Sequence, residues 1–181
     1  MNTGSFHLIV RATEMAERLH RNHKRDYTGL PYFTHLIEVA GYVAAANLPA
    51  EAVAAALLHD AIEDVGATTD MIAKSLGWEV ANLVDELTDV YTSKAYPKIN
   101  RTRRKALERA RLAEVSYYAK SIKLADLTSN ARDIVSNDTG FAKLYLAEKE
   151  ALLKVLKPSD SFLMRNAEAT LRASLRALET A

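Results

Sequence analysis

The chain of 181 residues contains no cysteine. This absence excludes disulfide bonds, thiolate metal ligands and a cysteine nucleophile, and it suits a reducing compartment, so we expect a cytoplasmic location. The sequence also lacks an apolar run of the roughly 18 residues that a membrane helix requires. Its first residues lack the basic, apolar and small-residue pattern of a secretion signal. We therefore expect a protein that does not associate with a membrane.

The chain also has little net charge, with a formal value of +1 at pH 7. So small a value gives no overall attraction to nucleic acid or to anionic lipid, and any attraction to anions must be local. Hydrophobic residues make up 49% of the chain and charged residues 26%, as in ordinary globular proteins. No repeat or low-complexity segment is present. We expect one domain over residues 1–181, large enough for a hydrophobic core.

Apolar residues recur at helical spacing along almost the whole chain, and no segment alternates as a strand would. Residues 121–126 are ambiguous by propensity, but the pattern through Ile134 favours a helix. Residues 26–32 form a loop marked by Gly29 and Pro31, and Thr68 can cap a short helix. The fold class is therefore all-α with about eight helices. The expected segments are 6–24, 33–47, 49 through the His-Asp pair, 69–77, 79–90, 100–114, 121–134, 141–156 and about 159–180.

Four ionisable residues follow the apolar, alanine-rich run Ala52–Leu58, namely His59, Asp60, Glu63 and Asp64. If the helix continues, His59 lies one turn from Glu63 and Asp60 one turn from Asp64, so all four share one broad face. Burying such groups is costly unless they are paired or bind a cation. The pattern predicts a metal site in which His59 and Asp60 are ligands, with Glu63 and Asp64 close by for proton transfer.

A metal site needs more ligands than these two, and two further residues stand in apolar helical surroundings. His35 begins the second expected helix, and Asp126 lies within the run at residues 122–126. Two imidazoles and two carboxylates make a mixed nitrogen and oxygen shell, which suits Mn²⁺, Fe²⁺ or Zn²⁺ better than Ca²⁺. Open positions on such an ion can hold water and a phosphate oxygen.

The ordered set of His, His-Asp and Asp resembles the HD superfamily of metal-dependent phosphohydrolases. Residues 31–35, 56–64 and 123–130 resemble more closely the hydrolase domain of the RelA/SpoT enzymes. The resemblance extends over about residues 20–156. Because the chain leaves no room for a synthetase domain, it resembles a stand-alone small alarmone hydrolase.

The resemblance implies an activity, a cofactor and roles for individual residues. In that family one Mn²⁺ ion helps water to hydrolyse the 3′-diphosphate of (p)ppGpp, which gives GDP or GTP and pyrophosphate. Glu63 and Asp64 then correspond to the acidic pair that orients or deprotonates the attacking water. The positions that correspond to the metal ligands are His35, His59, Asp60 and Asp126.

Three further positions correspond to nucleotide contacts in the family. Asn130, one turn beyond Asp126, would contact the nucleotide at its ribose. Arg25 matches an arginine that packs on the purine. Tyr145 falls near a position at which related enzymes place an aromatic side chain in the nucleotide pocket.

The segment from Lys98 to Arg111 is strongly basic, with seven Lys or Arg residues and one acid, Glu108. Lys98, Arg101 and either Arg104 or Lys105 follow helical spacing and can form one cationic ridge. Arginine can hold phosphate oxygens with a bidentate fork, so the ridge is a candidate clamp for phosphates distant from the metal. A solvated charged face is the alternative interpretation.

The chain also departs from the family pattern, at Asp26, at Leu36 and at residues 127–129. These departures spare the expected ligands and leave the substrate open between (p)ppGpp, ppApp and the 2′-phosphate of NADPH. A non-catalytic nucleotide- or RNA-binding module, with residues 98–111 as its contact, is an alternative of another class. The acidic pair argues against it, because negative charge beside a phosphate does not help a protein that only binds. We expect a small nucleotide as partner, not nucleic acid, and homo-oligomerisation is compatible with the sequence.

Overall fold

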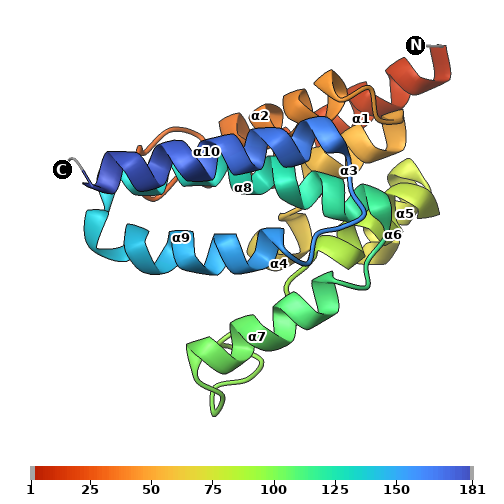
Figure 1. Cartoon of the computed structure of the whole chain (residues 1–181). Helices are drawn as coiled ribbons and strands as arrows, with labels where there is room; N and C mark the ends of the chain where they lie inside the picture. The colour runs from red at the N-terminus through yellow and green to blue at the C-terminus, as the bar shows by residue number, and fades with distance from the viewer. Residues whose placement is uncertain (1–2, 180–181) are drawn as a thin grey trace.

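The computed structural model of the protein describes residues 3–179. Within this range it describes every side chain except those of residues 132, 133, 135, 136 and 139. This range contains ten helices and no strand, apart from an isolated bridge between Lys24 and Pro31. The expected all-α class is confirmed, with more helices than the eight or so expected (Figure 1). The helices are α1 (Thr3–Leu19), α2 (Phe33–Ala45), α3 (Ala50–Leu58), α4 (Ala61–Val65), α5 (Thr69–Leu76), α6 (Trp78–Leu87), α7 (Arg101–Leu112), α8 (Tyr117–Asn137), α9 (Thr139–Leu153) and α10 (Ser161–Glu179).

Helix α3 lies at the centre of the N-terminal half, and every residue from Ala52 to Leu58 is buried. Four of these seven residues are alanines, whose small side chains let α1, α2 and α6 pack closely around α3. Helix α8 joins this half to the rest, because it packs against α2 and α6 on one side and against α9 and α10 on the other. The C-terminal end of α3 and the middle of α8 are thereby brought together in the interior.

Helix α7 stands apart from the layer formed by α8, α9 and α10 (Figure 1). Only Glu108 and Leu112 are buried among its residues. The Glu108 carboxylate accepts hydrogen bonds from the backbone N–H groups of Val90 and Tyr91, at 3.1 and 3.0 Å. These polar contacts, together with the core residue Leu112, hold α7 in place.

Several helix boundaries follow the sequence signals. The Thr68 side chain accepts a hydrogen bond from the backbone N–H of Met71 at 3.2 Å, as expected for a cap, and Pro49 is the N-cap of α3. Residues 121–126 are helical within α8, and α10 corresponds to the expected segment 159–180, whose residue 180 lies outside the described range. No helix within residues 3–179 combines the length and apolar character needed to cross a bilayer.

One expectation is wrong: a single helix does not run through His59 to Asp64. Helix α3 ends at Leu58 with His59 as C-cap, and α4 begins at Ala61 with Asp60 as N-cap, at φ −100° and ψ 2°. On a continuous helix, neighbouring side chains would diverge by about 100°. At this break they converge instead, and the His59 Nε2 and Asp60 Oδ2 atoms lie 3.0 Å apart.

Candidate metal centre and adjoining cavities

Two histidines and two aspartates from different elements meet beside α8. His35 comes from the first turn of α2, His59 and Asp60 from the break after α3, and Asp126 from the middle of α8. His35 Nε2 lies 3.5 Å from Asp126 Oδ1 and 3.7 Å from Asp60 Oδ2. His35, His59 and Asp126 each offer a ligand atom, and these atoms lie within 4.8 Å of one another, close enough to hold one metal ion.

Hydrogen bonds at the far side of each imidazole determine which nitrogen faces the cluster. His59 Nδ1 lies 2.8 Å from the carbonyl oxygen of Ala56, which can only accept, so Nδ1 carries the hydrogen. Ser129 Oγ donates to the Glu38 carboxylate at 2.8 Å and therefore accepts from His35 Nδ1, 2.9 Å away. Both rings, when neutral, present the Nε2 lone pair to the cluster, as is typical of metal ligands.

The two Nε2 atoms provide the test of whether a metal ion fits. Both are buried, and among the described residues neither makes a hydrogen bond, although His59 Nε2 lies 3.0 Å from Asp60 Oδ2. Buried polar atoms are rarely left without partners, and here both belong to a group of imidazole and carboxylate donors. That donor set suits a divalent transition metal ion, so the residues fit the predicted site.

Asp126 is held by two further side chains. Lys123 donates to its Oδ2 at 2.9 Å, and the Asn130 amide donates to its Oδ1 at 2.5 Å. Burial alone would raise the pKa of Asp126, but the Lys123 ammonium and the neighbouring imidazoles outweigh it and hold the pKa well below its usual range. Asp126 is therefore ionised and ready to bind a cation.

The other two charges of the cluster depend on each other. Burial opposes ionisation of His59, but the carboxylates of Asp60 and Asp126 outweigh it and raise the pKa of His59 to about 10. Burial also disfavours ionised Asp60, yet the His59 charge lowers the pKa of Asp60 below its usual range. The two carboxylates thus require a positive charge beside them, which either a proton on His59 or a metal ion can provide.

A cavity of about 320 Å³ opens beside the cluster. Glu63 and Asp64, on α4, line it together with Asp60 and Asp126. Burial, and then repulsion from Asp89, raises the pKa of Glu63 to about 7. The pKa of Asp64 is also raised, by burial and then by Asp60. The acidic pair therefore shares one cavity with the candidate metal ligands, and Glu63 titrates near neutral pH.

The three predicted nucleotide contacts all line the same cavity. Arg25 lies on the loop before α2, where its Nη1 atom is 3.9 Å from Glu38 Oε2. Asn130 lies one turn beyond Asp126 on α8 and already donates to that carboxylate. Tyr145 of α9 is 7% exposed, and its buried hydroxyl has no hydrogen-bond partner within the described chain.

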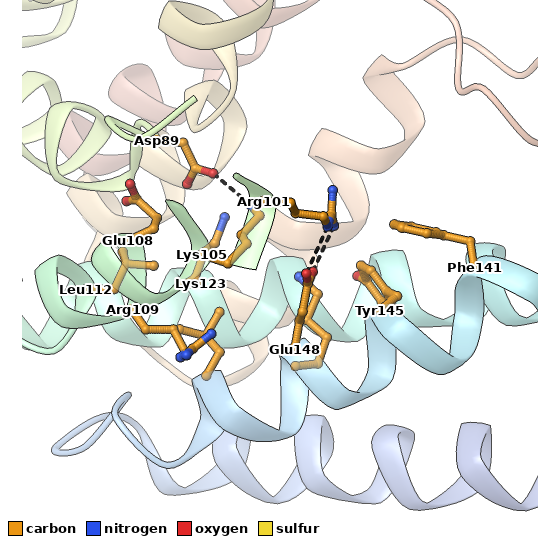
Figure 2. A pocket seen from close by; sticks show the side chains of 12 residues that line it. Asp89, Arg101, Lys105, Glu108, Arg109, Leu112, Lys123, Phe141, Tyr145 and Glu148 are labelled. Atoms are coloured by element: carbon orange, nitrogen blue, oxygen red, sulfur yellow. Dashed lines mark hydrogen bonds and ion pairs between the residues drawn. The ribbon is translucent and has the colours of Figure 1, made fainter. Parts of the chain in front are cut away.

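The predicted cationic ridge is only partly at the cavities. Arg101 lines a second cavity, of about 170 Å³, and forms a bidentate pair with Glu148 of α9, at 2.9 and 2.8 Å (Figure 2). Arg104 donates to the carbonyl oxygen of Ile99, and Lys98 is exposed. Neither Lys98 nor Arg104 is among the described residues that line these two cavities, so their role as a phosphate clamp stays a prediction.

Several residues around the site were not singled out from the sequence. The Tyr32 hydroxyl donates to Asp60 Oδ2 at 2.5 Å, and Ser129 orients His35. Lys123 pairs with Asp126, and its position one turn earlier on the same helix could have indicated this contact. Lys149, one turn beyond Tyr145, lines both cavities and carried no comparable signal.

Known proteins resemble the chain in both sequence and structure. A family model described as an HD domain matches residues 12–150. Over 129 residues the chain is 37% identical to guanosine-3′,5′-bis(diphosphate) 3′-pyrophosphohydrolase MESH1 of Homo sapiens. The matched region covers 70% of this chain and 69% of that protein. The protein of the same name from Danio rerio is 35% identical over 137 residues, covering 74% and 73%.

A solved structure is similar over almost the whole chain. It is that of a metazoan ortholog of SpoT, a protein that hydrolyses ppGpp and plays a role in starvation responses. The TM-score is 0.81 at 26% sequence identity, and the match covers 92% of this chain and 94% of the other. The overall helical arrangement is thus shared with that protein.

Proposed function

This chain belongs to the HD-domain family of metal-dependent phosphohydrolases, and from that premise we propose that it hydrolyses the 3′-diphosphate of (p)ppGpp with the aid of one Mn²⁺ ion. The observation that carries the proposal is that two buried imidazole nitrogens, without a hydrogen bond in the described part of the chain, meet two carboxylates beside the acidic pair Glu63 and Asp64. The relatives named above support the choice of substrate. The residues that would hold the ion are His35, His59, Asp60 and Asp126.

A divalent ion at this position would supply Lewis acidity at the phosphoryl group and would acidify water. In the reaction a water oxygen bonds to the phosphorus attached to the 3′ oxygen. The bond between that phosphorus and the 3′ oxygen breaks, pyrophosphate leaves, and the 3′ oxygen takes up a proton. The products are GDP or GTP and pyrophosphate.

Glu63 is the residue best suited to take the proton from water. Its pKa of about 7 means that the carboxylate accepts and releases a proton near neutral pH, where general acid–base catalysis is most effective. Asp64, its neighbour on α4, would orient the water, and its Oδ2 atom lies 3.9 Å from His23 Nδ1. Two carboxylates beside a bound phosphate would weaken binding, so the pair favours hydrolysis over a purely binding role.

A side-by-side comparison of substrates tests the proposal. Purified protein with Mn²⁺ is given ppGpp, ppApp or NADPH, and the release of pyrophosphate or phosphate is measured, with Glu63→Gln as the variant lacking the base. We expect ppGpp to be hydrolysed fastest and Glu63→Gln to be slower by about 10²- to 10⁴-fold on every substrate. Faster turnover of ppApp or NADPH would reassign the substrate within the same chemistry, whereas salt-sensitive RNA binding without any turnover would contradict the proposal.

A further inference from the structure

The second cavity adjoins the first, and four residues line both: Asp89, Lys123, Tyr145 and Lys149. It lies between α7 on one side and α8 and α9 on the other, as Figure 2 shows. Its volume of about 170 Å³ is far more than the roughly 10–15 Å³ that one water molecule needs. These four side chains therefore form a shared wall that a ligand in either cavity would contact.

Three lysines from three helices line the second cavity, and two of them, Lys123 and Lys149, also line the first. They are Lys105 of α7, Lys123 of α8 and Lys149 of α9, here called the lysine cluster. Two carboxylates stand among them, and each already has a lysine partner. Lys105 Nζ lies 3.3 Å from Asp89 Oδ2, and Lys123 Nζ lies 2.9 Å from Asp126 Oδ2. The lysine cluster therefore has one positive charge more than these carboxylates balance.

Within the lysine cluster, the excess charge belongs to Lys149, while Arg109 of α7 also lines the second cavity. No carboxylate pairs with Lys149 in the part of the chain that the structure describes, and its recorded contact is the Tyr145 ring, whose centroid lies 4.5 Å from Nζ. The remaining acids of the second cavity are paired elsewhere, Glu148 with Arg101 and Glu108 with Arg111. Burial, opposed by the Asp126 carboxylate and reinforced by Lys123 and Lys105, lowers the pKa of Lys149 to about 7.

A second group at the same wall also lacks a partner. The Tyr145 hydroxyl is buried without a hydrogen bond, on a residue that lines both cavities. An ammonium group and a hydroxyl group one helical turn apart are two donors that an anion with several oxygens could satisfy together. Among the described residues, the shared wall thus has a lysine without a carboxylate partner and a hydroxyl without a hydrogen bond, and it lies between two cavities.

We propose that Lys149 binds the diphosphate that the nucleotide carries away from the scissile bond, and that this contact selects nucleotides phosphorylated at two positions. The proposal rests on the proposed function, because only then does the scissile diphosphate lie at the metal ligands. Lys149 is on this account a specificity-determining residue. The proton transfer remains with Glu63.

Binding of two simple nucleotides tests the proposal without turnover. Isothermal titration calorimetry with the full-length, Mn²⁺-loaded protein compares GDP, which carries only the distal diphosphate, with guanosine. We expect GDP to bind tighter by about tenfold or more, as a charge-assisted contact implies, and Lys149→Met to remove that preference. Lys149→Arg should retain it, and Lys143→Met, which changes an exposed lysine of the same helix, should behave as the unaltered protein.

Kinetics and thermal unfolding separate this role from a structural one. For ppGpp, Lys149→Met should raise KM by about tenfold and change kcat less than threefold. Its Tm at pH 7 should rise, because the variant removes a poorly compensated charge; Lys149→Gln is a second variant if the methionine protein does not fold.

The proposal is overturned if the unaltered protein binds GDP no better than guanosine, or if Lys149→Met keeps the full preference for GDP. A lower Tm in Lys149→Met with unchanged nucleotide preference would mean that Lys149 is only structural. A preference for GDP that depends on Lys149, found in a protein that does not hydrolyse ppGpp, would contradict the proposed function and leave the anion site standing.

Discussion

The two ends of the pair of adjoining cavities are built differently. At the end that holds the candidate metal ligands, here called the metal end, His35, His59 and Asp126 are almost fully buried. Hydrogen bonds fix the two histidines on their far sides, and Lys123 pairs with the Oδ2 atom of Asp126. At the α7 end, Arg101 and Lys105 are more exposed, with 43% and 39% of their side chains accessible, and they pair with carboxylates across the opening.

On the proposed function, this difference separates chemistry from recognition. The metal end is formed by α2, α3 and α8, which pack on one another, so its geometry is as rigid as the core. The α7 end depends on a few ion pairs, which contribute little individually when they are solvent-exposed. We therefore expect changes at the metal end to abolish activity and changes at the α7 end to adjust affinity.

The largest effect is expected when the buried carboxylate of the metal end loses its charge. Asp126→Asn should lower kcat/KM for ppGpp by about 10³-fold or more, because metal catalysis supplies several kcal/mol. Bound manganese, measured on the purified variant, should fall in parallel. Asp70→Asn, which changes an exposed acid on α5, is the matched control. Full metal content with lost activity would remove Asp126 from the ligand set.

Removing the proposed base should cost activity and spare the metal. Glu63→Gln should lower kcat by about 10²- to 10⁴-fold, the usual contribution of general base catalysis, with metal content unchanged. The Glu63 pKa is about 7 in the metal-free protein, and a bound cation nearby lowers it, so kcat/KM of the unaltered protein should rise with pH at or below that value as the carboxylate forms. That rise should be absent from the residual activity of the variant, and its persistence would assign the ionisation to another group.

A change at a residue that contacts a candidate metal ligand, but would not contact the metal, should have an intermediate effect on metal binding. Ser129→Ala removes the group that accepts from His35 Nδ1 and should weaken Mn²⁺ binding by about 10- to 100-fold. Titration of the metal-free protein with Mn²⁺ measures this change, and the loss of activity should be reversed at high Mn²⁺ concentration. Ser93→Ala, at an exposed position outside the helices, should bind Mn²⁺ normally.

At the lysine cluster the expected effect is on stability and depends on pH. The pKa of Lys149 falls from 10.5 to about 7 on folding, so the unfolded chain binds more protons between these values. The contribution of Lys149 to the free energy of unfolding therefore increases from pH 7 to pH 10.5 and is constant below 7. The stability gain of Lys149→Met, measured by urea unfolding, should be largest at pH 7 and below and should vanish towards pH 10.5. A gain independent of pH would contradict this.

The smallest effect is expected for the ion pair across the opening. Arg101→Met should lower the free energy of unfolding by less than about 1 kcal/mol, since the pair with Glu148 is partly exposed. A double-mutant cycle with Glu148→Gln gives the pair energy directly. A coupling well above that value would show that the α7 end is as firmly built as the metal end.

The sequence singled out the residues that meet at the metal end, but it predicted less of the α7 end, for a physical reason. His35, His59, Asp60 and Asp126 stand out because ionisable residues in apolar helical runs are costly to bury. The break between α3 and α4 escaped prediction, because no Gly or Pro marks it and the convergence of His59 and Asp60 depends on tertiary contacts such as the Tyr32 hydroxyl.

At the α7 end, the number of basic residues in the sequence did not indicate which of them lack a carboxylate partner. The run from Lys98 to Arg111 looked like a phosphate ridge, yet Arg101 and Lys105 already have carboxylate partners. Arg109 of that run lines the second cavity without a recorded carboxylate partner among the described residues. The only lysine of the cluster in that condition is Lys149, which stands among ordinary residues of α9 and becomes notable only when α7, α8 and α9 are assembled. Pairing between distant helices cannot be read from composition.

The most direct test of the central claim is pyrophosphate release from ppGpp by metal-stripped protein, with and without added Mn²⁺. We predict release only when Mn²⁺ is present, and none from Asp60→Ala under either condition. Equal release without metal, or no release although Mn²⁺ is bound at one ion per chain, would contradict the account of a metal-dependent alarmone hydrolase.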